Sequence, residues 1–172
     1  MSEKHIPVVS FVGRSNTGKT TVIEQLIPIL REAGLRVAVI KHHHRDFDID
    51  KPGKDTYRYK QAGARITILT SPHKIAVVED IDVEPRLNAI VERFIQDADL
   101  LIVEGYKKES IPKIEVFQRR VDTPAPMCKD DKNLIAVITD ESIELPVPVL
   151  KRDDVQSVAD LILVRFIRKT GV

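Results

Sequence analysis

The sequence predicts an α/β fold in which a mostly parallel β-sheet lies between layers of helices. Short apolar runs rich in β-branched residues alternate along the chain with longer segments of helical periodicity. The apolar runs are continuous, which is typical of parallel strands covered on both faces. The 172 residues have the length of one domain and contain no repeat, low-complexity tract or linker, so we expect a single domain over residues 1–172.

The first elements follow one another as strand, helix and strand. Residues 6–12 form the first apolar run. Residues 20–33 have apolar residues at helical spacing and stop before Gly34, which suits a left-handed helix cap. Pro28 lies inside this helix, where we expect a kink. Residues 37–40 form the next strand and complete a right-handed β-α-β unit.

The remainder of the chain continues this alternation. Two strands are expected at residues 65–70 and 74–78, joined by a Ser71-Pro72 turn. The other predicted elements are a helix through residues 58–62 capped by Asp55 or Thr56, a helix at 85–96, strands at 100–103, 113–117, 134–138 and 147–150, and a helix at 155–167. Residues 119–132 are rich in proline and charge and are expected to form a loop.

Composition and charge exclude several classes of protein. Lys and Arg total 27 and Asp and Glu total 26, and the formal net charge of +1 argues against a protein that mainly coats nucleic acid. Cys128 is the only cysteine, which excludes an intramolecular disulfide and a site of paired cysteines. No apolar run reaches the roughly 18 residues of a membrane span, and the first residues lack a signal-peptide pattern. We therefore expect a cytoplasmic protein.

Residues 13–20 match the phosphate-binding pattern G-x-x-x-x-G-K-[ST]. The glycines let the backbone approach a phosphate, which then faces N–H groups and the positive end of the following helix. Lys19 would place its charge between the outer phosphates, and the Thr20 hydroxyl would join a magnesium shell. We predict a P-loop nucleotide-binding fold that holds the phosphates of a purine nucleoside triphosphate with Mg²⁺, and we favour GTP for the reasons given below. The residues assigned to the nucleotide in this segment are Gly13, Asn16, Thr17, Gly18, Lys19, Thr20 and Thr21.

Two acidic residues follow predicted strands at the edge where ligands gather. Glu104 ends the strand at residues 100–103, and an acid at the tip of a neighbouring strand helps to hold magnesium in P-loop proteins. Asp99 begins the same strand and lies at the wrong end, because ligands collect at the carboxyl ends of parallel strands. Asp140 follows the strand at residues 134–138. Its carboxylate could accept hydrogen bonds from the N1–H and 2-amino groups of guanine, a donor pair that adenine lacks.

Histidines and acids are dense in residues 41–50, which follow the second strand at the same edge. Imidazoles and carboxylates would suit a borderline transition metal. The segment would equally bind an anion through Lys41, Arg45 and protonated histidines, supply an acid to the magnesium shell, or form a polar loop without a ligand. We take Asp50 as the catalytic or magnesium-linked acid and Lys54 as a phosphate-binding residue.

Several motifs occur together with the phosphate loop. They are Lys41-His42-x-His44, Pro52-Gly53-Lys54-Asp55, Ala62-Gly63-Ala64, Val103-Glu104-Gly105-Tyr106-Lys107 and Pro112-Lys113-Ile114-Glu115-Val116. In this combination the chain resembles the MobB family, the molybdopterin-guanine dinucleotide biosynthesis adapter proteins, over about residues 8–140. The positions that match the family's motifs include Lys19, Thr20, Glu104 and the loop with His42, His44 and Asp50.

The resemblance implies a GTP-binding adapter that assists attachment of GMP to molybdopterin beside the guanylyltransferase. It further implies a homodimer, partners among the molybdenum cofactor proteins, weak GTP hydrolysis at most, and a Rossmann-like fold with an extra β-hairpin region. Two alternatives stay open from the residues themselves. One is a small-molecule kinase or ATP-dependent ligase that uses Asp50 and Lys54, and the other is a metal-delivery GTPase that uses residues 42–44.

Overall fold

The computed structural model describes residues 6–168, which divide into two compact units. The first unit contains residues 6–42 and 95–168, and the second contains residues 43–94. The single domain expected from the sequence stays a prediction. In the described part of the chain, no helix has both the length and the apolar character needed to cross a membrane.

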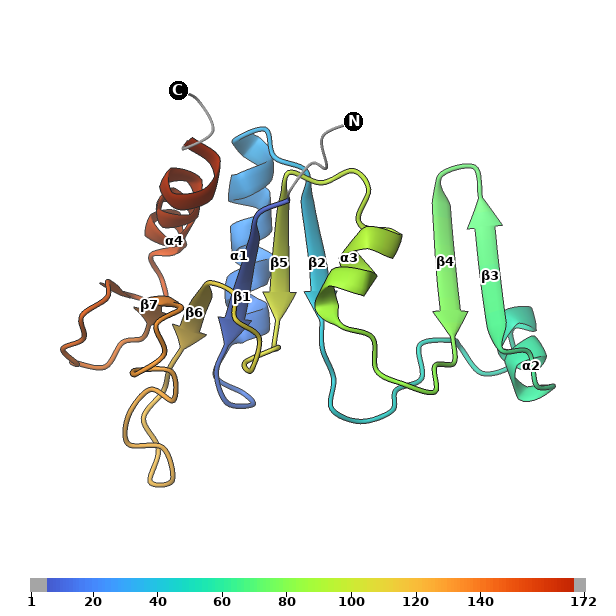
Figure 1. Cartoon of the computed structure of the whole chain (residues 1–172), viewed down its shortest axis with the longest axis horizontal. Coiled ribbons are helices and arrows are strands. Elements are labelled where there is room, and N and C mark those ends of the chain that lie inside the picture. The colour runs from blue at the N-terminus through green and yellow to red at the C-terminus, as the bar shows by residue number, and fades with distance from the viewer. Residues whose placement is uncertain (1–5, 169–172) are drawn as a thin grey trace. The chain divides into compact units, whose positions relative to one another are not determined.

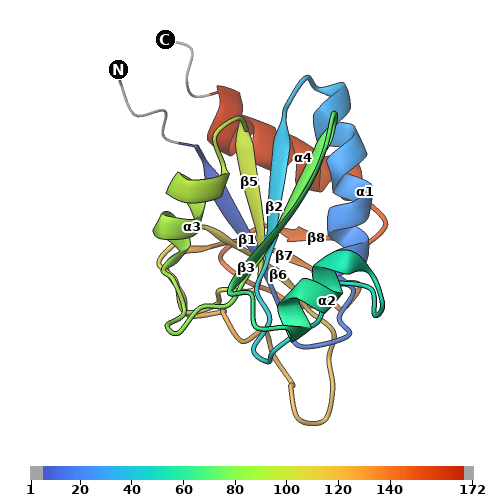
Figure 2. The same cartoon turned by 90° about the vertical axis from the view of Figure 1, so that its right-hand side faces the viewer.

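A parallel sheet of six strands forms the frame of the first unit, in the order β2-β5-β1-β6-β7-β8. Figure 1 labels all of these strands except β8, which is labelled in Figure 2. Its strands are β1 (Val8–Val12), β2 (Val37–Lys41), β5 (Leu100–Glu104), β6 (Lys113–Val116), β7 (Leu134–Ile138) and β8 (Val149–Leu150). All neighbouring strands are parallel, with Phe11 opposite Glu104 and Lys41 opposite the same residue from the other side. The α/β fold with a parallel sheet is therefore confirmed, and the carboxyl ends of β1, β2 and β5 meet at one edge.

Two helices cover one face of this sheet, namely α1 (Lys19–Glu32) and α4 (Val155–Ile162) (Figure 2). The predicted helix boundaries differ from these by a few residues, and α1 continues through Pro28 without interruption. The chain after α4 widens into a π-helix over Leu163–Ile167. Apolar residues of both helices form one buried cluster with alternate residues of the strands, among them Phe11 and Ile102, which are fully buried.

A second buried cluster lies on the other side of the sheet. It joins Val12, Phe117, Leu134 and Val137 to Cys128, and apolar residues of segment 143–147 pack against it. Loop residues therefore cover this part of the sheet. Residues 119–132 are irregular apart from a single bridge between Arg120 and Thr123, as the sequence predicted.

The second unit contains an antiparallel pair of strands and two short helices. These elements are α2 (Asp55–Gln61), β3 (Ile66–Ser71), β4 (Lys74–Glu79) and α3 (Leu87–Phe94). The strands pair from Ile66 with Glu79 to Ser71 with Lys74, which makes a β-hairpin closed by a short turn. The α2 cap predicted at Asp55 or Thr56 is wrong, because Lys54 occupies the cap position and the two predicted residues lie in the first turn.

Candidate functional site

The phosphate loop connects β1 to α1, the context that the motif requires. Gly13 has a φ of 144°, and a Cβ there would overlap the carbonyl oxygen of Val116. Gly18 has a φ of 89° at the start of α1. Position 13 therefore needs glycine both for its backbone conformation and because a side chain would not fit. Position 18 needs glycine for its backbone conformation.

The first turn of α1 is open to an anion. Among the described residues no side chain caps this helix, and its first turn contains no acidic residue. The first N–H groups of a helix have no partner within the helix and carry the positive end of its dipole. The strand–loop–helix arrangement therefore provides the donors that a phosphate group needs.

Lys19 lies across the mouth of the loop. Its Nζ donates hydrogen bonds to the carbonyl oxygens of Gly13, at 3.0 Å, and Arg14, at 2.8 Å. Burial lowers the pKa of Lys19 from its ordinary value, and nearby Lys41 lowers it as well, whereas Glu104 acts in the opposite direction. An incoming phosphate would stabilise the positive charge of this partly buried ammonium.

Thr20 and Glu104 lie together at the carboxyl edge of the sheet. The Thr20 hydroxyl donates to Glu104 Oε2 at 3.1 Å, and the other carboxylate oxygen is 3.5 Å from Lys41 Nζ. A hydroxyl and a carboxylate are oxygen ligands that suit Mg²⁺, which keeps several waters and uses few protein ligands. The pair therefore fits a magnesium ion placed beside the phosphates.

The first histidine of the run packs beside the glycine that follows Glu104. Gly105 has a φ of 106°, a Cβ there would come within 3.2 Å of His42 Cβ, and the Gly105 carbonyl accepts from Ser10 Oγ at 2.6 Å. The His42 ring lies against the Tyr106 ring, with centroids 4.5 Å apart. Across residues 6–168, no group of three or more His, Cys, Asp and Glu side chains is arranged to hold a metal ion.

Asp140 lies just beyond β7 and is held by Arg152, a residue that the sequence analysis missed. The Arg152 backbone N–H donates to Asp140 Oδ1 at 3.3 Å, and Arg152 Nε lies 3.4 Å from Oδ2. Arg152 follows β8, whose end was predicted, so its position at the carboxyl edge of the sheet could be inferred from the sequence. Its contact with Asp140 could not, because it depends on the parallel pairing of β7 with β8.

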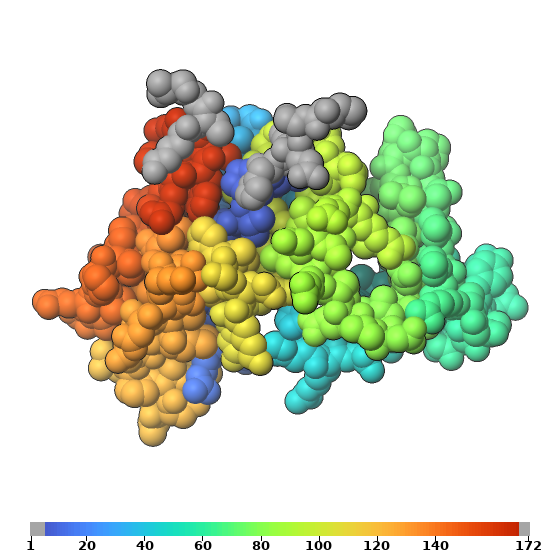
Figure 3. Space-filling view, in the orientation of Figure 1, coloured from blue at the N-terminus to red at the C-terminus, as the bar shows by residue number. Residues whose placement is uncertain are grey.

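The loop of residues 119–132 lies beside the phosphate loop. Arg14 pairs with the Asp122 carboxylate at 3.0 Å, and Arg120 donates to the Asn16 carbonyl at 3.3 Å. Figure 3 shows this loop in orange next to the blue tip of the phosphate loop, at the lower edge of the first unit. Two positions that the motif leaves variable thus contact a neighbouring loop, Arg14 through its side chain and Asn16 through its backbone carbonyl.

Two buried charged residues of β6 fasten the base of the same loop. Glu115 accepts from the N–H groups of Met127 and Cys128, each at 2.8 Å. Lys113 is almost fully buried and pairs with the Asp131 carboxylate at 2.9 Å. The Lys-Ile-Glu-Val motif therefore has a structural role, because its charged residues anchor the loop and its apolar residues enter the core.

Asp50 and Lys54 belong to the second unit. Asp50 Oδ1 accepts from the Thr56 hydroxyl at 3.2 Å, and its Oδ2 is buried without a hydrogen-bond partner among the described residues. Lys54 is exposed at the start of α2. Their assignments to catalysis, magnesium and phosphate stay predictions.

Comparison with known families gives one match that covers most of the chain. The model of the family described as "Molybdopterin guanine dinucleotide synthesis protein B" matches residues 8–140. Two bacterial relatives carry the name molybdopterin-guanine dinucleotide biosynthesis adapter protein. The Escherichia coli protein is 37% identical over 96% of this chain and 97% of its own length. The Haemophilus influenzae protein is 35% identical over 91% of this chain and 88% of its own length.

Solved structures of similar proteins have the same fold. A crystal structure of molybdopterin-guanine biosynthesis protein B is 33% identical, covers 91% of this chain and 97% of its own, and superposes with a TM-score of 0.73. The Bacillus subtilis MobB structure is 27% identical, covers 94% of this chain and 98% of its own, and superposes with a TM-score of 0.74.

Proposed function

The chain belongs to the molybdopterin guanine dinucleotide synthesis protein B family, and we therefore propose that it is a GTP-binding adapter for synthesis of the guanine dinucleotide form of the molybdenum cofactor. In this function it binds GTP and Mg²⁺ and acts beside the guanylyltransferase in the cytoplasm, with weak GTP hydrolysis at most. The adapter name of its relatives supports this function.

One observation carries the nucleotide part of the proposal. Thr20 directly follows the lysine of the phosphate loop, and its hydroxyl lies 3.1 Å from Glu104 Oε2. The loop and the first turn of α1 would hold the phosphates, Lys19 would neutralise the outer ones, and Thr20 with Glu104 would hold Mg²⁺. The ion would supply positive charge against the phosphate oxygens. Asp140 would select guanine.

Calorimetric titration with GTP and with ATP, each with and without Mg²⁺, tests this assignment. We expect GTP to bind more tightly than ATP and more tightly with Mg²⁺ than without it. Lys19→Ala should lose most of the nucleotide affinity while circular dichroism and thermal unfolding show an intact fold. Unchanged nucleotide affinity in Lys19→Ala would show that the phosphate loop does not bind the nucleotide. Tighter binding of ATP than of GTP by the wild-type protein would favour the kinase or ligase alternative.

The homodimer is also part of the proposal, and the hairpin of the second unit supports it. Ile66, Ile68, Ile75 and Val77 share one face of the β3–β4 pair according to the strand register, and all are exposed, Ile75 by 70%. A two-stranded hairpin has little stability of its own, and an apolar face of this kind favours burial against another surface. A second copy of the chain offers a self-complementary partner for such a face.

Association with the enzyme distinguishes an adapter from a free-standing nucleotide-binding enzyme. We expect the purified guanylyltransferase to bind this protein, with an affinity that changes when GTP and Mg²⁺ are present. Biolayer interferometry with wild type and Lys19→Ala measures both effects. The metal-delivery alternative predicts instead tight stoichiometric nickel or zinc binding, which the same calorimeter would detect.

A further inference from the structure

Arg152 joins three segments at the edge of the candidate site. Its Nη1 donates to the carbonyl oxygen of Thr17 in the phosphate loop at 2.6 Å, and its Nη2 donates to the carbonyl oxygen of Phe117 after β6, also at 2.6 Å. Its Nε and backbone N–H face the two carboxylate oxygens of Asp140 after β7. The side chain is only 26% exposed. One guanidinium therefore links the phosphate loop to the segment proposed to recognise the base.

The chemistry of the side chain makes this link rigid. A guanidinium presents its donors in a fixed planar fork, whereas a lysine ammonium is a point charge on a flexible stem. Because the three contacts of Arg152 use different nitrogens, they fix both the position and the orientation of the fork. The Asp140 carboxylate is consequently held at a set distance from the Thr17–Gly18 peptide.

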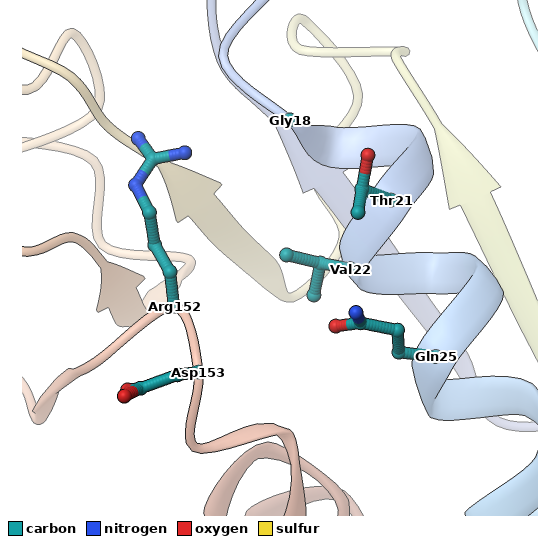
Figure 4. A pocket seen from close by; sticks show the side chains of 6 residues that line it. All are labelled: Gly18, Thr21, Val22, Gln25, Arg152 and Asp153. Carbon is teal, nitrogen blue, oxygen red and sulfur yellow. The ribbon is translucent and has the colours of Figure 1, made fainter.

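The same arginine forms one wall of a pocket beside α1. The pocket has a volume of about 380 Å³ and is lined by Gly18, Thr21, Val22, Gln25, Arg152 and Asp153. Figure 4 shows Val22 and Gln25 pointing from α1 toward the side of Arg152, while the Asp153 carboxylate turns away from the helix. Gly18 is part of the lining, so the pocket adjoins the phosphate loop.

Asp140 keeps free acceptor positions although it is paired. A carboxylate has about four lone-pair sites, and Arg152 faces one on each oxygen. The Asp140 side chain is 65% exposed, so its remaining sites are accessible. The arginine therefore orients the carboxylate without closing it to a ligand that brings two donors.

We propose that Arg152 is a specificity-determining positioning residue, which orients Asp140 toward guanine and couples base recognition to the phosphate loop. The inference rests on the proposed GTP-binding function. A ligand that carries both phosphates and a guanine contacts the phosphate loop and Asp140. A ligand that carries phosphates alone contacts only the phosphate loop. Loss of Arg152 should therefore reduce the affinity for the first ligand more than the affinity for the second.

The test is calorimetry in the presence of Mg²⁺ with four ligands: GTP, ITP, ATP and inorganic triphosphate. ITP lacks the 2-amino group of guanine, so the ratio of GTP to ITP affinity reports on a second donor to the Asp140 carboxylate. The variants are Arg152→Ala, Arg152→Lys and Asp140→Asn. Arg36→Ala is the matched control, because Arg36 pairs with Asp99 at the opposite end of β5.

Arg152→Ala is expected to lower the affinity for GTP by about tenfold, the effect of losing an oriented hydrogen bond to a charged group. The affinity for triphosphate should change by less than about threefold. The ratio of GTP to ITP affinity should fall toward that of Asp140→Asn. The double variant Arg152→Ala/Asp140→Asn should bind GTP no more weakly than Asp140→Asn. Arg152→Lys keeps the charge and the fold but should lose the same selectivity. Arg36→Ala should keep wild-type ratios.

The inference would be overturned if Arg152→Ala lowered the affinity for all four ligands equally. It would also be overturned if Arg152→Lys kept the wild-type ratio of GTP to ITP affinity. Failure of the proposed function has a different signature, since the wild-type protein would then bind neither GTP nor triphosphate, or would bind ATP more tightly than GTP. If the wild type binds GTP and ITP equally, the phosphate loop keeps its role and the positioning role of Arg152 is refuted.

Discussion

The Thr20 hydroxyl donates a hydrogen bond to Glu104 Oε2 at 3.1 Å, although the two residues are 84 positions apart in the sequence. Strand pairing produces this contact. β1 and β5 are parallel neighbours, Phe11 lies opposite Glu104, and the phosphate loop then carries the chain from β1 to Thr20. The register of β1 and β5 thus determines the relative position of the two oxygen ligands proposed for magnesium.

Glu104→Gln should weaken the magnesium-dependent part of GTP binding. The amide preserves size but removes the charge, and we expect Mg²⁺ affinity in the presence of GTP to fall by roughly ten- to a hundredfold, the usual effect of losing a carboxylate that supports a metal site. Calorimetry at several Mg²⁺ concentrations measures it. Asp99→Asn alters an acid at the other end of β5 and should leave the magnesium dependence unchanged. Equal responses of the two variants would argue against the site.

Much of the first unit could be predicted because its signals are local. Continuous apolar runs specify buried parallel strands, and the glycines and lysine of residues 13–20 specify the phosphate loop within eight consecutive residues. Glu104 could be predicted because an acid at a strand end lies at the ligand-binding edge. Each of these inferences needs only neighbouring residues and the rule that ligands collect at the carboxyl ends of strands.

The contacts that surround the phosphate loop could not be predicted in this way. Arg152 reaches Thr17 across 135 positions, and Arg14 reaches Asp122 across 108. Long charged side chains are common on protein surfaces, so nothing in the sequence singles out these pairs. Lys113 and Glu115 lie in a segment correctly predicted as a strand, but their burial depends on a loop that supplies their partners.

Paired substitution of the hairpin face should dissociate the proposed dimer. Ile68→Asp/Ile75→Asp places two carboxylates on the exposed apolar face of β3–β4. A buried unpaired charge is costly, so the dimer Kd should rise at least about tenfold. Sedimentation velocity over a concentration series measures it, and Val121→Asp, at a fully exposed position of the loop in the first unit, is the control. A dimer that survives in the double variant would require another interface.

Glu115→Gln should destabilise the protein by loosening the loop of residues 119–132. The carboxylate accepts two backbone N–H groups, and a glutamine amide has only one acceptor oxygen, so one buried donor loses its partner. The free energy of unfolding in urea should fall by about 1–3 kcal/mol. Glu141→Gln is the control, since Glu141 pairs with exposed Arg119 and such pairs contribute about 0–1 kcal/mol. Similar losses in both variants would contradict the anchoring role of Glu115.

Cys128 should make stability depend on alkaline pH. Burial, together with the charges of Glu115 and Asp131, raises the pKa of its thiol from 9.0 to about 11. In the unfolded chain the thiol ionises near pH 9.0, whereas in the folded protein it stays protonated until about pH 11. Its contribution to stability is therefore complete below pH 9 and is lost as the pH rises through this interval, because ionisation then favours the unfolded state.

The measurement is the free energy of unfolding of wild type and Cys128→Ala at pH 7.5, about 9 and about 10.5. Lysines and tyrosines titrate in both proteins, so the difference between the two isolates the thiol. We expect Cys128→Ala to be less stable than wild type at pH 7.5, because a buried side chain is truncated, and the gap to narrow as the pH rises. A gap that stays constant across the series would mean that the thiol ionises equally in both states and is accessible to solvent in the folded protein.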